Sequence, residues 1–225
     1  MTAAIPPGVC LNVGSGPSNP AGWVNLDGSW QARLAGHAWL ARFGRAMLGA
    51  DIGHWPRGVQ HRDIRRGLPF GPGSVAVVYA SHVLEHLHRA ETVRFLTHVR
   101  KLLKPGGVCR VVVPDLRAIV GWYLEHCDGH AGSGSDLLMD MMMLRPRDAG
   151  AGNRVMGLVR RATDLHEHKW MYDQAGLLAV FHEAGFAHAA ARQYLESVIP
   201  RERLEQVERA DRIRDGAGVC VEATA

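Results

Sequence analysis

Short apolar runs with strand character alternate with helical patterns along most of this chain. The clearest runs are Val9–Val13, Val75–Ala80 and Val108–Val113, and an amphipathic helical pattern over Glu91–Leu103 separates the last two. Continuous apolar runs suit strands that are buried on both faces, and helices between such strands act as parallel crossovers. The alternation therefore predicts an α/β fold, with one mostly parallel sheet covered by helices.

Weaker patterns extend this arrangement over the rest of the chain. We expect further strands at Trp23–Leu26, Val59–Ile64, Ala189–Tyr194 and Val219–Ala223. We expect further helices at Gln31–Leu48 and Val83–Leu87, a helix capped by Asp173 and running to Glu183, and a charged, solvent-facing helix at Pro200–Arg214. Lys104–Gly107 should stop the helix before it, because proline cannot continue a helix and glycine tolerates the turn.

The stretch between Asp115 and Trp170 fits the alternation least well. It contains Gly-Ser punctuation at Gly129–Ser135 and a methionine-rich run at Leu137–Leu144. It is too short and too broken to build a core of its own. We therefore expect a single domain over residues 1–225, with an inserted lid or acceptor segment at about 115–170. The methionines suit an adaptable pocket wall, or ordinary packing in a lid or a homodimer.

Composition and charge argue against a membrane protein and against a nucleic-acid-binding protein. No apolar stretch approaches the roughly 18–20 residues that cross a bilayer, and residues 1–8 lack the pattern of a signal peptide. These absences predict a cytoplasmic protein with no membrane partner. The net charge of +4 is spread over the chain without a basic cluster, which argues against a nucleic-acid partner. The arginines near Trp30–Leu48 would suit a membrane surface, but a helix covering the sheet is the favoured interpretation.

A glycine-rich turn follows the first predicted strand. Leu11–Pro17 reads Leu-Asn-Val-Gly-Ser-Gly-Pro, and the second strand leads into Asp27. Gly14 and Gly16 let the backbone turn sharply and approach a ligand closely, although a purely structural turn is the alternative. In open α/β sheets the ligand lies beyond the carboxyl ends of the strands. A carboxylate at that edge can accept hydrogen bonds from both hydroxyls of a ribose.

The spacing of these residues separates two kinds of cofactor. Asp27 follows Gly16 by 11 residues, whereas dinucleotide-binding enzymes place the acid about 20 residues beyond their glycines. Little room remains for the helix whose N-terminus would bind a pyrophosphate. S-adenosylmethionine (SAM) has no phosphate and loses less without that helix. SAM is therefore the favoured cofactor, and a nicotinamide-dependent dehydrogenase is the less favoured alternative.

Polar residues also follow the third and fourth predicted strands. Asp63 can bind the amino group of adenine while Ile64 packs on the ring, unless Asp63 is simply a surface turn residue. Ser81 and His82 fall at the carboxyl end of the fourth strand, on the same edge. Histidines 82, 86 and 168 can act as a general base because imidazole titrates near neutral pH, although a structural role is more common. No metal site is expected, since no His-Glu-x-x-His pattern or cysteine pair is present.

Together these motifs resemble the small bacterial class I SAM-dependent methyltransferases of the type 11 kind. The similarity covers most of the chain except residues 30–58 and 117–165, and its stretches are Leu11–Gly16, Gly22–Asp27, Asp63–Phe70, Ser81–Leu87, Leu103–Gly107, Val111–Leu116, His168–Asp173 and Ala184–Phe186. The resemblance implies a Rossmann-like class I methyltransferase fold. Such a fold has a mostly parallel seven-stranded sheet with helices on both faces and an antiparallel last strand.

The resemblance also implies a role for each matching residue. The cofactor set contains the glycine turn near the methionine part of SAM, the ribose acid, the adenine pair and a polar residue that lines the cofactor: Gly14, Ser15, Gly16, Asp27, Asp63, Ile64 and Ser81. Asn12 belongs to the same set, although it stands where the family usually has an acid that reads the SAM amino group. Ser18 replaces the third glycine of the family pattern.

The methyl acceptor is expected beside Asp115–Asp173, because this segment follows the fifth strand next to the predicted position of the SAM methyl. His168 and Tyr172 near its end offer a base and a hydroxyl, so His82, His168 and Tyr172 are the catalytic candidates. The resemblance favours a small-molecule or glycan-type acceptor. A SAM-fold module that binds or assembles without methyl transfer is the alternative from a different class of protein.

Overall fold

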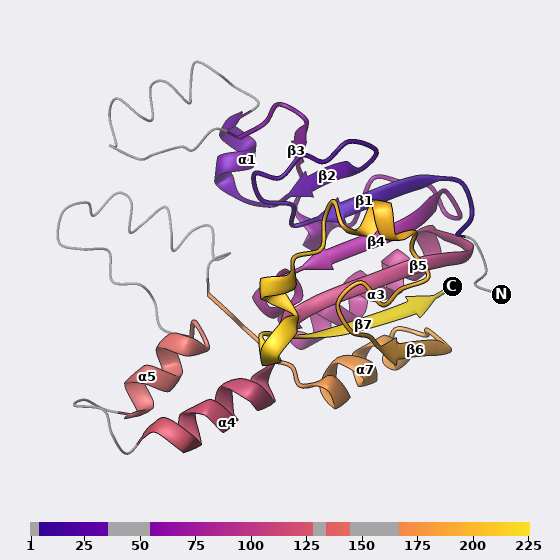
Figure 1. Ribbon diagram of the computed structural model, residues 1–225. Coiled ribbons are helices and arrows are strands. Elements are labelled where there is room, and N and C mark those ends of the chain that lie inside the picture. The colour runs from indigo at the N-terminus through magenta and orange to yellow at the C-terminus, as the bar shows by residue number, and fades with distance from the viewer. Residues whose placement is uncertain (1–4, 36–54, 128–133, 145–166) are drawn as a thin grey trace.

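The computed structural model describes residues 5–35, 55–127, 134–144 and 167–225. They build a seven-stranded sheet with the order β3-β2-β1-β4-β5-β7-β6 (Figure 1). The strands are β1 (Val9–Val13), β2 (Val24–Asp27), β3 (Val59–His61), β4 (Val75–Ser81), β5 (Leu103–Pro114), β6 (His188–Ala191) and β7 (Gly218–Thr224). All the expected strands are present, although several begin or end at different residues.

The directions of the strands also agree with the prediction. Neighbouring strands from β3 through β5 pair in parallel. β7 runs antiparallel to both of its neighbours, β5 and β6. A mostly parallel sheet with an antiparallel last strand is therefore confirmed.

Helices and short 3-10 turns connect the strands. The α-helices are α1 (Trp30–Ala35), α3 (Arg89–Leu102), α4 (Leu116–His126), α5 (Gly134–Met141), α7 (Gln174–Glu183) and α8 (Arg201–Leu204). The 3-10 turns are η1 (Ile64–Arg66), η2 (Leu84–His86), η4 (Ala210–Arg212) and η5 (Arg214–Gly216). Most of the helix expected over Gln31–Leu48 lies outside the described residues. Within the described ranges, no helix is both long and apolar enough to cross a bilayer.

Local sequence explains where the main helices begin and end. Asp173 caps α7, since its side chain accepts a hydrogen bond from the backbone N–H of Gly176 at 2.7 Å. Gly185, with φ of 92°, follows the end of this helix in a conformation that side chains other than glycine rarely adopt. At the start of α3, the His88 backbone N–H donates to Glu91 at 2.9 Å, which closes a capping box.

Apolar side chains fill both faces of the sheet. On one face, α3 and α7 bury a large cluster that includes Leu96, Val99 and Phe181. On the other face, Leu204 and Ile213 pack in a second cluster with Tyr79 of β4. The sheet is therefore covered on both sides, as predicted. α4 and α5 pack against each other and extend away from the sheet beyond the end of β5 (Figure 1).

The prediction of a solvent-facing helix over Pro200–Arg214 is wrong. This region contains the four-residue helix α8 followed by 3-10 turns. Both Leu204 and Ile213 are buried against the sheet, and a continuous helix would place residues nine apart about 180° from each other. The chain also turns Glu208 inward, where its carboxylate lies 2.7 Å from the fully buried guanidinium of Arg110. Burial and this ion pair override the helical pattern of the sequence.

Candidate functional site

A cavity of about 290 Å³ opens at the carboxyl ends of β1, β2, β3 and β4. The strand order reverses between β1 and β4, and this switch point is where open α/β sheets bind their ligands. The four loops and the start of α1 line the cavity with Gly14, Gly16, Asp27, Gly28, Ser29, Gln31, Trp55, Arg62, Asp63, Ile64, Arg65, His82, Val83, His86 and Leu87. Six of the predicted site residues thus share one cavity: Gly14, Gly16, Asp27, Asp63, Ile64 and His82.

Gly14 and Gly16 differ in the space that surrounds their Cα atoms. Both adopt positive φ, 68° at Gly14 and 57° at Gly16. A Cβ on Gly14 would lie 2.1 Å from Cγ2 of Val83, so the turn packs directly on the loop after β4. A Cβ on Gly16 would meet nothing within 4 Å. Gly16 therefore leaves open space at the lip of the cavity, where a ligand can approach the backbone.

Asp27 ties two loops of the cavity together. Its Oδ2 accepts a hydrogen bond from the Gly16 backbone N–H at 2.9 Å, and its Oδ1 accepts one from Ser29 at 2.8 Å. An ionised carboxylate has about four acceptor positions, so about two remain for ligand hydroxyls. The side chain is largely buried and lines the cavity. This geometry fits a ribose acid that is held in place before the ligand arrives.

Asp63 lines the same cavity and caps η1. Its side chain accepts from the Arg65 backbone N–H, and the Arg65 guanidinium lies 2.9 Å from Oδ1. Burial raises the pKa of Asp63, but the hydrogen bonds and charge of Arg65 outweigh it and hold the pKa below its usual value. Ile64 follows directly and also lines the cavity, so a charged acceptor and an apolar surface stand side by side for a base.

Three of the predicted cofactor residues do not line the cavity. Asn12 is buried in β1, and its Nδ2 donates to Asn25 on β2 at 2.9 Å. Ser81 is buried at the end of β4, where its hydroxyl accepts from Arg212 at 3.2 Å. The hydroxyl of Ser15 donates to the carbonyl of Gly16 at 3.1 Å. These three residues are near cavity-lining residues in the sequence, but their side chains make hydrogen bonds within the protein instead of lining the cavity.

His82 occupies a strained position at the edge of the cavity. Its φ is 56°, a left-handed conformation that is uncommon outside glycine and often marks functional sites. Its Nδ1 lies 3.3 Å from Oε1 of Glu85. The Glu85 side chain is fully buried, so its carboxylate is held in place and can orient the His82 imidazole. Glu85 was not among the predicted site residues, although the His-x-x-Glu-His spacing in the sequence places it one turn after His82.

The other two catalytic candidates lie further from the cavity. His168 is buried next to His86, and the two imidazole centroids are 5.0 Å apart. Burial lowers the pKa of His168, although Glu85 opposes this effect. The Tyr172 hydroxyl donates to Thr92 at 3.0 Å inside the core, and burial raises the pKa of Tyr172. His168 therefore contacts His86, which lines the cavity, whereas the Tyr172 hydroxyl points into the core.

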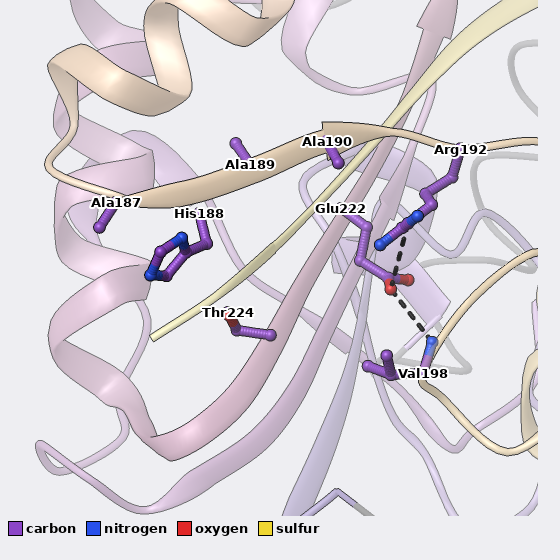
Figure 2. Close-up of a pocket in the computed structure, with 8 residues that line it drawn as sticks. All are labelled: Ala187, His188, Ala189, Ala190, Arg192, Val198, Glu222 and Thr224. Atoms are coloured by element: carbon purple, nitrogen blue, oxygen red, sulfur yellow. Dashed lines mark hydrogen bonds and ion pairs between the residues drawn. The ribbon is translucent and has the colours of Figure 1, made fainter. Parts of the chain in front are cut away.

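A second hollow, of about 310 Å³, lies at the edge of the sheet along β6 and β7 (Figure 2). One of its polar residues is Glu222, whose Oε1 accepts from the Val198 backbone N–H at 3.1 Å and lies 4.0 Å from Nε of Arg192. The same carboxylate pairs with the buried Arg110. This carboxylate is saturated by the protein itself, and the hollow touches neither the glycine turn nor Asp27. We assign the candidate site to the first cavity.

The sheet order, with parallel strands from β3 to β5 and an antiparallel β7, is that of a Rossmann-like, class I SAM-dependent methyltransferase. The model of the family described as a methyltransferase domain matches residues 7–190. The chain belongs to this family, and its cofactor is SAM.

The solved structures that this chain resembles share little sequence with it. They include a SAM-dependent methyltransferase, possibly a histamine N-methyltransferase, from Thermotoga maritima (16% identity, 98% of this chain and 83% of that chain, TM-score 0.49). Others are SAM-dependent methyltransferases from Mesorhizobium loti (17%, 96% and 90%, 0.45) and Archaeoglobus fulgidus (13%, 97% and 86%, 0.48). No curated protein matches the sequence at a significant level.

The cavity residues fit this cofactor. Gly16 leaves space for the ligand, Asp27 keeps free acceptor capacity, and Asp63 with Ile64 offers a hydrogen-bond acceptor beside an apolar surface. When bound, SAM supplies a methyl group activated by a positively charged sulfur. The chain must then hold this methyl in line with an acceptor and exclude water from it.

Proposed function

We propose that the protein transfers the methyl group of SAM to a small-molecule or glycan-type acceptor that binds against the segment 115–170. One observation carries this proposal. All the large hydrophobic side chains that are exposed in the described part of the chain come from this segment: Trp122, Leu124, Met143, Leu144 and Trp170. Large apolar side chains that are left exposed to solvent are candidates for a binding surface. Indole rings in particular combine a flat apolar face with a polar N–H, which suits a sugar or a ring-containing metabolite.

Backbone contacts connect this segment to the cofactor site. The N–H of Leu116, at the start of α4, donates to the carbonyl of Tyr172 at 2.9 Å. At the end of α5, the Met143 carbonyl accepts from the His168 N–H at 3.2 Å. His168 in turn contacts His86, which lines the cavity. An acceptor that rests on the segment would therefore meet the imidazoles next to the cofactor.

The positions of these residues suggest a role for each of them. Asp27 binds the ribose, Asp63 and Ile64 hold the adenine, and the backbone near Gly16 approaches the methionine part of SAM. His82, oriented by Glu85 at 3.3 Å, accepts the acceptor's proton where one must be removed. Correct alignment of the nucleophile with the sulfonium supplies much of the rate enhancement, whatever atom is methylated.

The direct test is incubation of the purified protein and isotope-labelled SAM with a metabolite extract, followed by mass spectrometry of labelled products. A labelled small molecule or glycan supports the proposal. SAM binding without any labelled product from metabolite, glycan and protein pools would favour a SAM-binding assembly module instead. NADH binding in the same cavity would revive the dehydrogenase alternative.

Deletion of Gly129–Met143 tests the acceptor segment separately. Acceptor methylation should disappear while SAM binding remains, because the cofactor residues all precede the deletion. Loss of SAM binding with the fold preserved would assign the segment to the cofactor site. If the methionine-rich run instead packs in a homodimer, the deletion should convert a dimer to a monomer in light scattering and leave methylation largely intact.

A further inference from the structure

A buried group of one carboxylate and two imidazoles lies directly behind the cofactor cavity. Glu85, His86 and His168 each present a ligand atom, and these atoms lie within 4.8 Å of one another. Glu85 is completely buried and His168 is 7% exposed. The three residues come from η2 and from the chain before α7, and their separation in the sequence explains why no metal motif was visible there.

Several buried polar atoms of this group have no hydrogen-bond partner among the described residues. Neither carboxylate oxygen of Glu85 accepts a hydrogen bond from any part of the chain that the structure describes, and the same holds for Nδ1 of His168. A buried carboxylate is costly unless it is paired, hydrogen-bonded or bound to a metal. The nearest cationic candidate is His82, whose Nδ1 lies 3.3 Å from one oxygen. The second oxygen has no hydrogen-bond donor among the described residues.

Each imidazole keeps a ring nitrogen available for a metal ion. Nδ1 of His86 lies 3.2 Å from the backbone carbonyl of Glu167, so an N–H there can donate to it and leave Nε2 with its lone pair. Such an outer contact orients the ring and selects the metal-binding tautomer. Nδ1 of His168 is buried and has no hydrogen-bond partner in the part of the chain that the structure describes.

We propose that Glu85, His86 and His168 bind a divalent transition-metal ion of the zinc type. Two imidazoles and one carboxylate form a ligand set that suits Zn²⁺ and leaves one position open. Ligand atoms about 2.0–2.1 Å from the ion stand about 3.3 Å apart in a tetrahedral site. The side chains must therefore draw together from their present spacing of up to 4.8 Å. Because His86 also lines the cavity, the proposed metal site adjoins the candidate cofactor site.

Calorimetric titration of metal-free protein with Zn²⁺ tests the site without any methyl acceptor. One equivalent of Zn²⁺ should bind, and Glu85→Gln and His168→Gln should each weaken the affinity at least tenfold. His188→Gln is the matched control, because His188 is exposed on β6 at the far edge of the sheet. Substitution with Co²⁺ should produce visible absorption without the intense near-ultraviolet bands of cysteine ligation.

Absence of stoichiometric Zn²⁺ binding, or equal losses in the control variant, would overturn the proposal. Thiolate bands in the Co²⁺ spectrum would also overturn it, since they assign the ion to a cysteine. If the buried variants fail to fold, His86→Gln replaces them, because His86 is only partly buried. SAM affinity is measured in parallel. A protein that binds SAM and methylates an acceptor but ignores Zn²⁺ refutes the metal site alone, whereas one that binds Zn²⁺ without any turnover refutes only the proposed methyl transfer.

Discussion

Replacement of Asp27 by alanine should weaken SAM binding and loosen the loops around the cofactor. The structure shows two backbone N–H groups bonded to this carboxylate, from Gly16 at 2.9 Å and Ser29 at 2.8 Å. Hydrogen bonds to a charged group contribute about 1.5–3 kcal/mol each, although water can replace part of this where the donors are only partly buried. We expect a loss of about 1–3 kcal/mol in binding free energy, which corresponds to roughly 5–150-fold in affinity.

Calorimetry with SAM and with S-adenosylhomocysteine measures this loss directly. Glu205→Ala is the control, because it removes a carboxylate that makes an exposed ion pair with Arg201. The control should keep both the affinity and the melting temperature of the parent protein. If Asp27→Ala binds SAM as tightly as the parent, Asp27 is not the ribose partner. If its melting temperature falls while affinity is unchanged, the carboxylate only organises the loops.

Three further predictions address packing, buried charge and the acceptor surface. Gly14→Ala should abolish measurable SAM binding in calorimetry, because its Cβ would lie 2.1 Å from a Val83 methyl at a φ of 68°; retained affinity would show that the turn can shift. Glu208→Gln should lower the free energy of unfolding by about 3–5 kcal/mol in urea denaturation, because it leaves Arg110 short of a buried counter-charge, while the exposed Glu202→Gln should cost little. Trp170→Ala should raise the KM for the acceptor and leave SAM affinity unchanged; the reverse pattern would move Trp170 out of the acceptor site.

The regular parts of the fold were predictable because they depend on local patterns. Continuous apolar runs such as Val75–Ala80 became central strands that are buried on both faces. Asp173 caps its helix as expected. The prediction failed at Pro200–Arg214, where the local pattern is helical but the buried residues are not spaced for one helix face. Tertiary contacts with Arg110 and the sheet decide the conformation there.

The meeting of several candidate site residues in one cavity was predictable for a related reason. In a parallel sheet, residues that directly follow different strands meet at one edge, so Gly14, Gly16, Asp27 and Asp63 could be placed together from sequence alone. Which way a side chain points was not predictable. Asn12 and Ser81 lie at the right positions along their strands, yet their side chains bond to Asn25 and Arg212.

By itself, therefore, the sequence determined the order of strands and helices along the chain, the class of fold and the edge of the sheet where the candidate residues gather. These features follow from hydrophobic periodicity, turn residues and strand ends, all of which are local. Only the tertiary structure decided which side chains from distant segments meet. Glu85 and His168 lie far apart in the chain but present ligand atoms within 4.8 Å. Glu85 and His168 are 83 positions apart in the sequence, and no local pattern encodes such a long-range contact.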